Sequence, residues 1–242
     1  MANAQRRTLT QMLTSIRYAL DDSSANPRWT DANLTDLINH NKDGVWNEVR
    51  KERKDYFLST RKSTDGTVTI LSQSYTTSSM ALTASATLDL TLPPDFIELR
   101  SFRAITSGYE WVKFTMRTAS DLDYRAVRAY PYATSPVAFY GAIENELTLA
   151  LGPMTDTALD TELVYIFQPV DLDSVTNTTL QMPYPLYKAV EAFTISDAFV
   201  MDDDPRGAVQ LNIARSVIAN VIGVDVRQSS DPIFVESADA YF

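Results

Sequence analysis

The spacing of apolar residues changes twice along this chain of 242 residues, and this change restricts the fold more than any other feature. Near the N-terminus, Leu9, Met12 and Ile16 recur every three or four residues, as they do on one face of an α-helix. Between about residues 66 and 181 the pattern becomes an alternation, clearest over residues 82–92, which is typical of half-buried strands. The helical spacing then returns. We therefore expect helices at both ends of the chain and strands between them.

Residues that favour helix ends support this division. Thr8 and Gln11 have the spacing of a capping box, in which a hydroxyl and an amide satisfy two backbone N–H groups. A second helix is predicted to begin near Thr30, another favourable N-cap residue. The last helix is predicted to begin after Asp204 and to end at Gly223, because glycine is common just beyond helix C-termini.

The alternating region predicts six or seven short strands in an antiparallel sandwich or partial barrel. Ser72–Ser79, which is rich in serine and threonine, is expected to form an exposed loop or a hairpin tip. Gly141–Asn145 is expected to form a hairpin turn. The strand candidates are residues 67–71, 82–92, 96–105, 111–116, 136–140, 147–151 and 163–167.

Together these patterns predict an α+β fold. The N- and C-terminal helices, over residues 1–62 and 182–223, build a helical bundle, and an antiparallel β domain over residues 63–181 is inserted between them. An extended C-terminal arm, over residues 224–242, follows the last helix because no apolar period is sustained there.

Composition excludes most enzyme classes. The chain has no cysteine and a single histidine, which excludes disulfide scaffolds, thiol catalysis, cysteine-based zinc sites and paired-histidine metal sites. Its seven glycines lie too far apart to form a dinucleotide- or phosphate-binding loop. We therefore expect no catalytic residues, no cofactor and no bound metal.

The charge is negative overall and unevenly distributed. The chain has 31 acidic and 21 basic residues and a net charge of −10, which argues against a freestanding nucleic-acid-binding protein. Residues 1–62 carry 11 basic and 8 acidic side chains, a net charge of +3, whereas residues 63–242 carry 10 and 23, a net charge of −13. Because the sequence has neither a signal-peptide pattern nor a run of about 20 apolar residues, we expect a protein made in the cytoplasm and not in a membrane.

Three groups of polar residues resemble sites of chemistry, but each has a simpler structural explanation. Asp202–Asp204 could bind a cation, yet consecutive side chains diverge, and the run suits a turn and a helix cap. Glu144 and Glu146 could act as a glycosidase pair, yet they lie at the expected hairpin turn. His40 lies on the polar side of a helix, and no nucleophile-elbow pattern accompanies it.

A basic cluster near the end of the second helix has three interpretations. It comprises Arg50, Lys51, Arg53 and Lys54, interrupted by Glu52. Cations are favoured at a helix C-terminus, so the cluster can be a solvated helix end. It can also form part of a subunit interface, or contact DNA phosphates.

The C-terminal arm carries apolar residues that a disordered tail would normally lack. It either packs back on its own domain or docks on a partner as an extended segment. Its candidate docking residues are Asp231, Pro232, Ile233, Phe234, Val235, Tyr241 and Phe242.

Four short motifs, taken in order, carry a family resemblance. They are LDD at residues 20–22, RWTDANL at 28–34, LPPDF at 92–96 and LQMPYPLY at 180–187. In their order and spacing they are similar to motifs of head-to-tail adaptor proteins, or head–tail connectors, of tailed bacteriophages, particularly short-tailed ones. The chain therefore resembles that family over most of its length.

The resemblance implies a structural protein of the virion neck or tail, without enzymatic activity or a cofactor. Such adaptors form a ring, typically a dodecamer, which joins the portal protein to a downstream tail or nozzle protein and lets DNA pass through its centre during ejection. In such proteins the helical part and the arm tend to engage the portal, which assigns the arm residues above to portal docking. The β region tends to face the tail, which makes Ser74, Tyr75 and Thr76 candidates for tail contacts. The acidic surface would then line a channel that repels DNA.

Two other functions remain open. A β-rich module of a virion fibre that recognises carbohydrate or protein would use aromatic side chains for stacking. A hydrolase would use Glu144 and Glu146 as acid and base. The aromatic residues available for stacking are Tyr109, Trp111, Tyr130, Tyr132 and Tyr140.

Overall fold

The chain divides into two compact units, described here from a computed structural model. One, the helical unit, comprises residues 1–56 and 171–242, and the other, the β unit, comprises residues 57–170. The expected plan, with terminal helices and an inserted β region, is confirmed. The structure describes residues 7–22, 27–70, 73–83, 88–110, 112–116, 138–145, 147–152 and 157–228.

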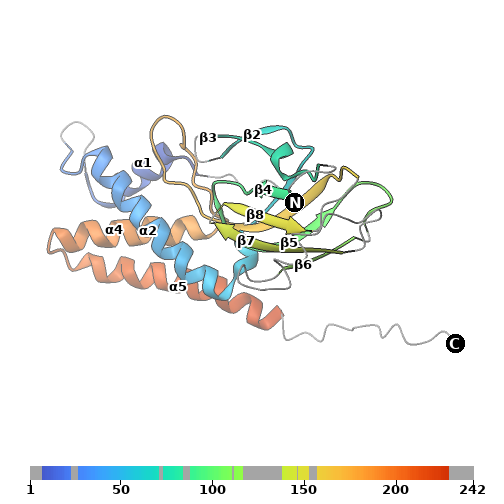
Figure 1. Ribbon diagram of the computed structural model, residues 1–242. Helices are drawn as coiled ribbons and strands as arrows, with labels where there is room; N and C mark the ends of the chain where they lie inside the picture. Colours follow the sequence, from blue (N-terminus) through green and yellow to red (C-terminus); the bar gives the residue numbers. More distant parts are fainter. Residues whose placement is uncertain are drawn as a thin grey trace. The chain divides into compact units, whose positions relative to one another are not determined.

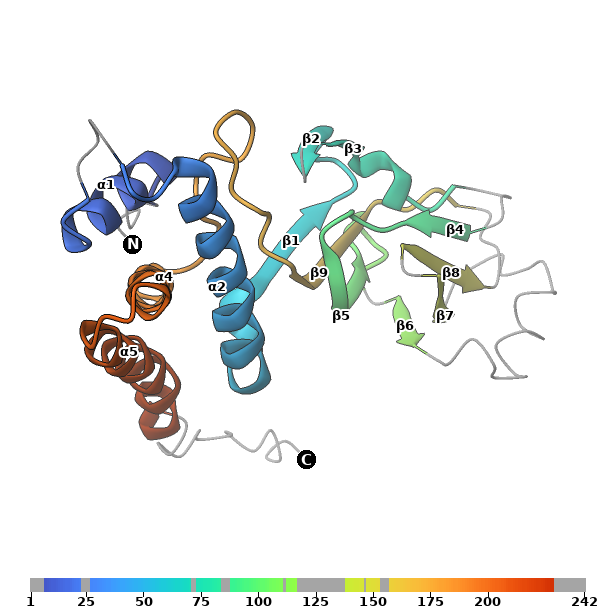
Figure 2. The same ribbon diagram turned by 90° about the vertical axis from the view of Figure 1, so that its left-hand side faces the viewer.

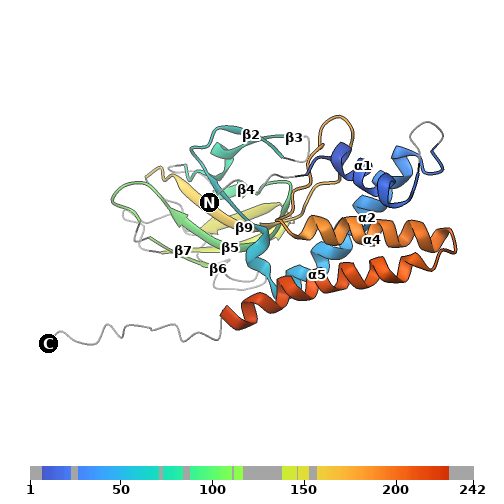
Figure 3. The ribbon, with the colours of Figure 1, turned by 180° about the vertical axis from the view of Figure 1, so that it is seen from behind.

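The helical unit is built around α4 (Leu186–Met201), whose sequence is apolar on nearly every side. Eleven of its 16 residues are buried. It is enclosed by α1 (Leu9–Ala19), α2 (Asp31–Glu52) and α5 (Arg206–Gln228). Figure 2 shows α4 between α1 and α2 on one side and α5 on the other. Figures 1 and 3 show α4 and α5 running side by side.

The helix ends follow local hydrogen-bonding preferences at three of the predicted positions. Thr8 Oγ1 accepts the N–H of Gln11 at 3.3 Å and Gln11 Oε1 accepts the N–H of Thr8 at 3.1 Å, so the capping box is confirmed. Thr30 caps α2, and Asp204 Oδ1 accepts the N–H of Arg206 at the start of α5. The predicted end at residue 223 is wrong. The backbone there does not take the left-handed conformation of a glycine cap, and α5 continues to residue 228.

The β unit contains two larger sheets and a hairpin. The first sheet has the strand order β1-β9-β5, the second has the order β4-β8-β7-β6, and β2 pairs with β3. The sheets do not close into a barrel within the described part of the chain. The strands are β1 (Leu58–Lys62), β2 (Thr67–Ile70), β3 (Gln73–Thr76), β4 (Leu88–Thr91), β5 (Phe96–Ala104), β6 (Lys113–Met116), β7 (Ala138–Asn145), β8 (Thr148–Gly152) and β9 (Thr161–Phe167).

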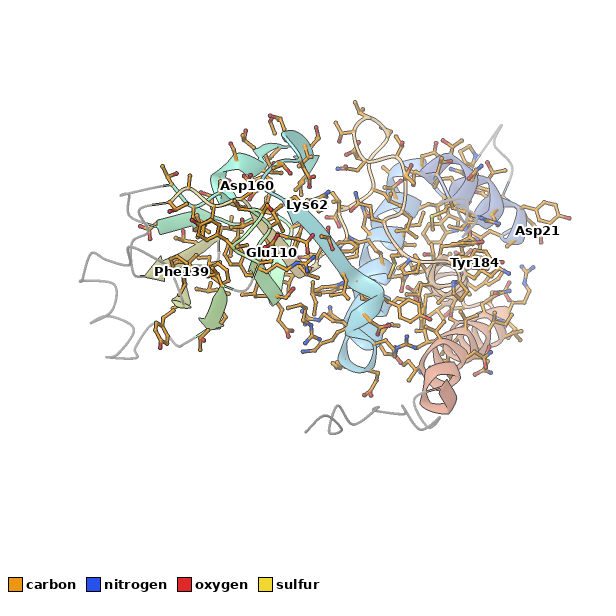
Figure 4. All side chains as sticks on the ribbon, turned by 90° about the vertical axis from the view of Figure 1, so that its right-hand side faces the viewer. Asp21, Lys62, Glu110, Phe139, Asp160 and Tyr184 are labelled. Carbon is orange, nitrogen blue, oxygen red and sulfur yellow. The ribbon has the colours of Figure 1, made fainter. Side chains whose placement is uncertain are left out.

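Both larger sheets contribute side chains to one hydrophobic core. Phe102 of β5 meets Phe114 of β6 edge to face, with ring centroids 4.8 Å apart. Phe114 in turn stacks on Phe139 of β7 at 5.2 Å. Phe139, labelled in Figure 4, is fully buried. Because aromatic rings bury large areas and prefer these geometries, this chain of contacts joins the two sheets.

For Ser72–Ser79 the sequence predicts an exposed loop or a hairpin tip; its described residues, 73–79, belong to the β2–β3 hairpin and a 3₁₀ helix rather than to a loop. Residues 73–76 form β3, and residues 77–80 form a short 3₁₀ helix. Tyr75 is buried, and its hydroxyl donates to the carbonyl of Thr91 at 2.6 Å. Thr77 is also buried, and its hydroxyl donates to the carbonyl of Gly66 at 2.8 Å. A segment rich in hydroxyl groups can be buried here because backbone carbonyls accept their hydrogen bonds.

Two further details of the β unit differ from the expectations. Gly141–Asn145 lies within β7 rather than in a turn, and a Cβ added at Gly141 would lie 2.5 Å from Leu151 Cδ2 of the neighbouring strand. This glycine therefore permits close strand packing rather than a reversal of the chain. In addition, β6 and β7 pair in parallel, so the second sheet is mixed rather than purely antiparallel.

The boundaries between the two units differ from the domain boundaries expected from the sequence. Leu58–Lys62 pair with β9 along their whole length, so this segment belongs to the β unit. The chain returns to the helical unit at Asp171, ahead of the helical period that begins after residue 181. Strand pairing and side-chain contacts set these boundaries. The spacing of apolar residues in the sequence does not reveal where they lie.

A buried carboxyl group, that of Asp95, lies directly before β5 and beside β9 in the β unit. Asp95 is 6% exposed, and its Oδ1 accepts the hydroxyl of Tyr165 at 2.8 Å. Burial raises the pKa of Asp95 above its ordinary value, although the hydrogen bond from Tyr165 opposes the shift. Burial, followed by the charge of Asp95, likewise raises the pKa of Tyr165.

We expect Asp95→Asn to remove part of the pH dependence of β-unit stability. Because the pKa of Asp95 is raised on folding, its favourable contribution is complete below the unfolded-state pKa of about 3.9 and is lost as pH rises through the folded-state pKa. Asparagine keeps an acceptor for Tyr165 and has no charge to bury. Denaturant titrations from pH 4 to 8 should show a smaller loss of stability with rising pH than in the wild type. Parallel profiles would contradict this.

The matched control is Asp95→Ala, which removes the acceptor together with the charge. The Tyr165 hydroxyl would then be left without its carboxyl partner in a buried site, at a cost of about 1–3 kcal/mol. This variant should therefore be less stable than Asp95→Asn at every pH.

Candidate functional site

In the helical unit, the segment at the start of α1 is hydrogen-bonded to the segment that precedes α4. The N–H of Leu9 donates to the carbonyl of Thr178 at 2.7 Å, and the N–H of Leu180 donates to the carbonyl of Arg7 at 3.1 Å. Arg7 also forms an ion pair with Glu191 of α4. The segment that returns from the β unit is therefore fixed against the start of α1.

Glu191 is the buried carboxylate of this junction. It is 8% exposed, and burial raises its pKa above the ordinary value. The guanidinium of Arg7 opposes the shift, and it also lies 5.1 Å from the centre of the Tyr187 ring. Because a buried carboxylate without a cation is costly, Arg7 stabilises the position of the N-terminal segment on α4.

Polar residues of α2 hold the same returning segment. The side chain of Lys42 is 1% exposed, and its Nζ lies 2.6 Å from Asp171 and 3.1 Å from Asp43. Asn39 exchanges two hydrogen bonds with the backbone of Leu172, at 3.0 and 2.7 Å. Sequence reasoning missed both residues because they occupy polar positions of the helix and the residues they hold in the returning segment lie more than 120 positions away.

The net charges of the two units differ from those of the sequence segments, because the helical unit combines residues from both ends of the chain. The helical unit carries 13 basic and 19 acidic residues, a net charge of −6, and the β unit carries 8 and 12, a net charge of −4. The basic N-terminal part and the acidic remainder seen in the sequence are therefore not separate surfaces. Among the described residues, the ion pairs between the N-terminal and C-terminal parts of this unit are Arg7–Glu191, Arg28–Asp202, Lys42–Asp171 and Arg206–Asp21.

An aromatic pocket of about 920 Å³ lies where α1 meets the segment before α4. Tyr184 and Tyr187 meet edge to face in it, with ring centroids 4.9 Å apart, and Lys188 lies 5.5 Å from the Tyr184 ring. Tyr184 is 53% exposed and is labelled in Figure 4. The pocket is lined by Arg7, Thr10, Gln11, Thr14, Ser15, Tyr18, Tyr184 and Tyr187.

A second concavity, the α1–α2 groove, has a volume of about 680 Å³. Two of its acidic residues have partners in the same unit: Asp31 lies 2.6 Å from Arg17, and Asp173 accepts hydrogen bonds from Val175 and Thr176. These bonds, chiefly those from Thr176, hold the pKa of Asp173 well below its usual range. The groove is lined by Leu9, Thr10, Leu13, Thr14, Arg17, Asp31, Ala32, Thr35, Asp36, Asn39, Leu172, Asp173, Ser174 and Thr178.

The basic cluster at the end of α2 divides into internal and exposed members. Arg53 holds Asp55 through two nitrogens, at 3.1 and 2.8 Å, and also donates to the carbonyl of Val221 in α5 at 3.3 Å. Arg50 lies over the ring of Trp46, and Lys51 is exposed. Arg53 therefore connects α2 to α5 within the unit, and a subunit contact of this cluster stays a prediction.

The other predicted contact residues are partly outside the described residues. The arm residues Asp231–Val235, Tyr241 and Phe242 all lie beyond residue 228. Ser74 and Thr76 lie exposed on β3, whereas Tyr75 between them is buried.

The acidic run before α5 acts as a turn and a cap. Asp202 pairs with Arg28 at 2.5 Å, and Asp204 caps α5, as expected. Within the described ranges no three acidic or histidine side chains are arranged to hold a metal ion. His40 is exposed on α2, and the side chains of Glu144 and Glu146 lie outside the described residues.

We expect Asp171 and Asp43 each to stabilise the buried ammonium group of Lys42, so that either carboxylate partly compensates for loss of the other. Asp171→Ala should lower the free energy of unfolding by about 1 kcal/mol, because Asp43 remains beside the ammonium group. Replacing both aspartates by alanine should cost about 3–5 kcal/mol, because both carboxylates beside a buried charge are lost. Glu48→Ala, at another exposed position of α2, is the control and should change stability by less than about 0.5 kcal/mol. Denaturation followed by helical circular dichroism measures all three, and equal costs for the single and double variants would contradict the sharing.

Comparison with models of protein families gives a match over most of the chain. The family model of the SU10 adaptor protein matches residues 7–230, which include the described parts of both units. No curated protein matches the chain. In the described part of the chain, no helix is both long enough and apolar enough to cross a bilayer.

Proposed function

The chain belongs to the SU10 adaptor protein family, and from this premise we propose that it forms a ring joining the portal to the tail of a short-tailed phage. Membership makes the chain a structural phage adaptor of the virion neck, with portal and tail proteins as its partners. The proposal adds the ring, typically a dodecamer, and the passage of DNA through its centre during ejection.

The observation that carries this proposal is the extent of the family match. It runs from residue 7 to residue 230 and so covers α1 at one end and the whole of α5 at the other. The β unit lies inside the matched range, so both units belong to the adaptor. A protein with two compact units has two separate surfaces on which different partners can bind.

The charge of both units supports the passage of DNA. Net charges of −6 and −4 leave neither unit basic, and a ring of such subunits multiplies the negative charge around its centre. Negative side chains repel DNA phosphates and release no counterions on contact, so DNA does not adhere.

The arm is assigned to the portal side. It follows the last described residue of α5, Gln228, and contains Asp231–Val235 with the terminal Tyr241 and Phe242. An extended segment with apolar anchors that binds a preformed surface loses conformational entropy on docking, so its binding depends on the partner. The exposed side chains of Ser74 and Thr76 on β3 are assigned to contacts with the tail.

A carbohydrate-recognition module of a virion fibre is the alternative, and the described aromatics give it little support. Tyr109 is partly buried against the β-unit core, and Tyr140 packs against Ala142 and Ala150. Trp111, Tyr130 and Tyr132 lie outside the described residues. Binding of the purified chain to a glycan array would favour this alternative.

Deletion of residues 229–242 should leave a folded chain that no longer binds the portal. The deletion begins after α5 and removes none of the described side chains, so the circular dichroism spectrum and the unfolding midpoint should remain those of the full chain. Co-sedimentation with purified portal rings should fall to background. Replacing Phe234, Tyr241 and Phe242 by serine in the full-length chain is the matched control for length, and it should weaken binding similarly. Unchanged co-sedimentation of both variants would overturn the portal role of the arm.

A further inference from the structure

The outer face of α5 has the composition of a contact surface. Val209 is 60% exposed and Ile213 is 45% exposed, one helical turn apart. From Gly207 to Gly223 the helix carries a single charged residue, Arg215. The α5 face comprises the exposed residues Ala208, Val209, Asn212, Ile213, Arg215, Ser216, Ala219, Asn220 and Gly223.

Another helix of the same unit shows what a solvated face looks like in this chain. The exposed positions of α2 include Asp36, Glu48, Lys51 and Glu52. An outward helix face in water normally carries such charges, and depletion of charge with exposed apolar side chains marks the core of an interface. The α5 face therefore differs from a solvated surface.

The α1–α2 groove provides a surface of complementary character. The half-buried Leu13 and the exposed Ala32 line it above the buried Leu9, and Asp36 adds an exposed carboxylate. Asp36 forms no ion pair with any described residue, unlike Asp31 in the same groove. Arg215 likewise has no acidic partner in the described ranges. Each surface thus presents apolar residues and one unpaired charge, and the two charges are opposite.

We propose that the α5 face of one copy of this chain binds in the α1–α2 groove of the next copy, with Arg215 opposite Asp36 of its neighbour. This inference rests on the proposed ring and names its subunit contact. Two different surfaces that recognise each other form a heterologous contact, which repeats from copy to copy and can close into a ring.

The positions of the two surfaces suit such a repeat. Figure 2 shows α1 and α2 on one side of α4 and α5 on the other side. A copy bound through its α5 therefore keeps its own groove accessible to a further copy. Because the helical unit contains both surfaces, each copy can contact two neighbours through this unit alone.

Charge reversal tests the pairing in the full-length chain. Arg215→Asp places a negative charge opposite Asp36, and Asp36→Arg places a positive charge opposite Arg215. Each single variant should weaken assembly by about tenfold or more in sedimentation velocity. The double variant, which restores opposite charges, should recover assembly to within about threefold of the wild type.

Apolar contact is tested separately. Ile213→Asp should abolish ring assembly, whereas Leu58→Asp, at a residue with the similar exposure of 43% on β1, should not. Both residues are exposed, so the unfolding midpoints of the variants should stay close to that of the wild type, and thermal unfolding checks this. Should a single variant unfold, the charge-reversal pair still decides the proposal.

The outcomes separate this inference from the proposed function. If the wild type, the charge-reversal variants and Ile213→Asp all form rings, that result overturns the α5–groove contact and leaves the proposed ring function intact. Variants that form rings but fail to bind the portal would show that α5 contacts the portal instead, which also overturns the contact. A wild-type chain that stays monomeric alone and with portal overturns both.

Discussion

The helical unit depends on the enclosure of α4. Eleven of the 16 residues of this helix are buried, so it cannot lie on a surface and must be covered on several sides. α1 and α2 come from one end of the chain and cover one side, and α5 covers the other. The two ends of the sequence must therefore meet around α4, and the β unit becomes an insertion between them.

The contacts that close this unit also explain its charge. The segment that returns from the β unit is held by Lys42 and Asn39 of α2 and by the backbone of residues 7–9. Because the basic N-terminal part and the acidic C-terminal part belong to one unit, both units carry a moderate negative charge. Residues that suggested separate basic and acidic surfaces thus serve internal structure. Arg53 also serves internal structure, since its guanidinium joins α2 to α5.

Because many charged residues have these internal roles, fewer side chains remain available for contacts with other proteins. A phage adaptor contacts portal and tail proteins, and within the described ranges no cluster of acidic or histidine side chains is arranged to hold a metal ion. In the described part of the helical unit, the surfaces left for assembly include the α5 face, with Val209 and Ile213, and the groove near Asp36. Neither was found from sequence. An exposed valine on a helix is recognised only when the buried face is known, and a groove requires two helices to be placed together.

The sequence by itself determined the order of helices and strands, the capping of α1, α2 and α5 and the insertion of the β region, because apolar period and capping depend on nearby residues. It also carried the motifs of the adaptor family. Only the tertiary structure decided that residues 73–79 are partly buried, that β6 pairs in parallel with β7 and that Lys42 lies in the interior. Each of these depends on partners distant in the chain, such as Asp171, 129 positions from Lys42, and local patterns contain no record of such partners.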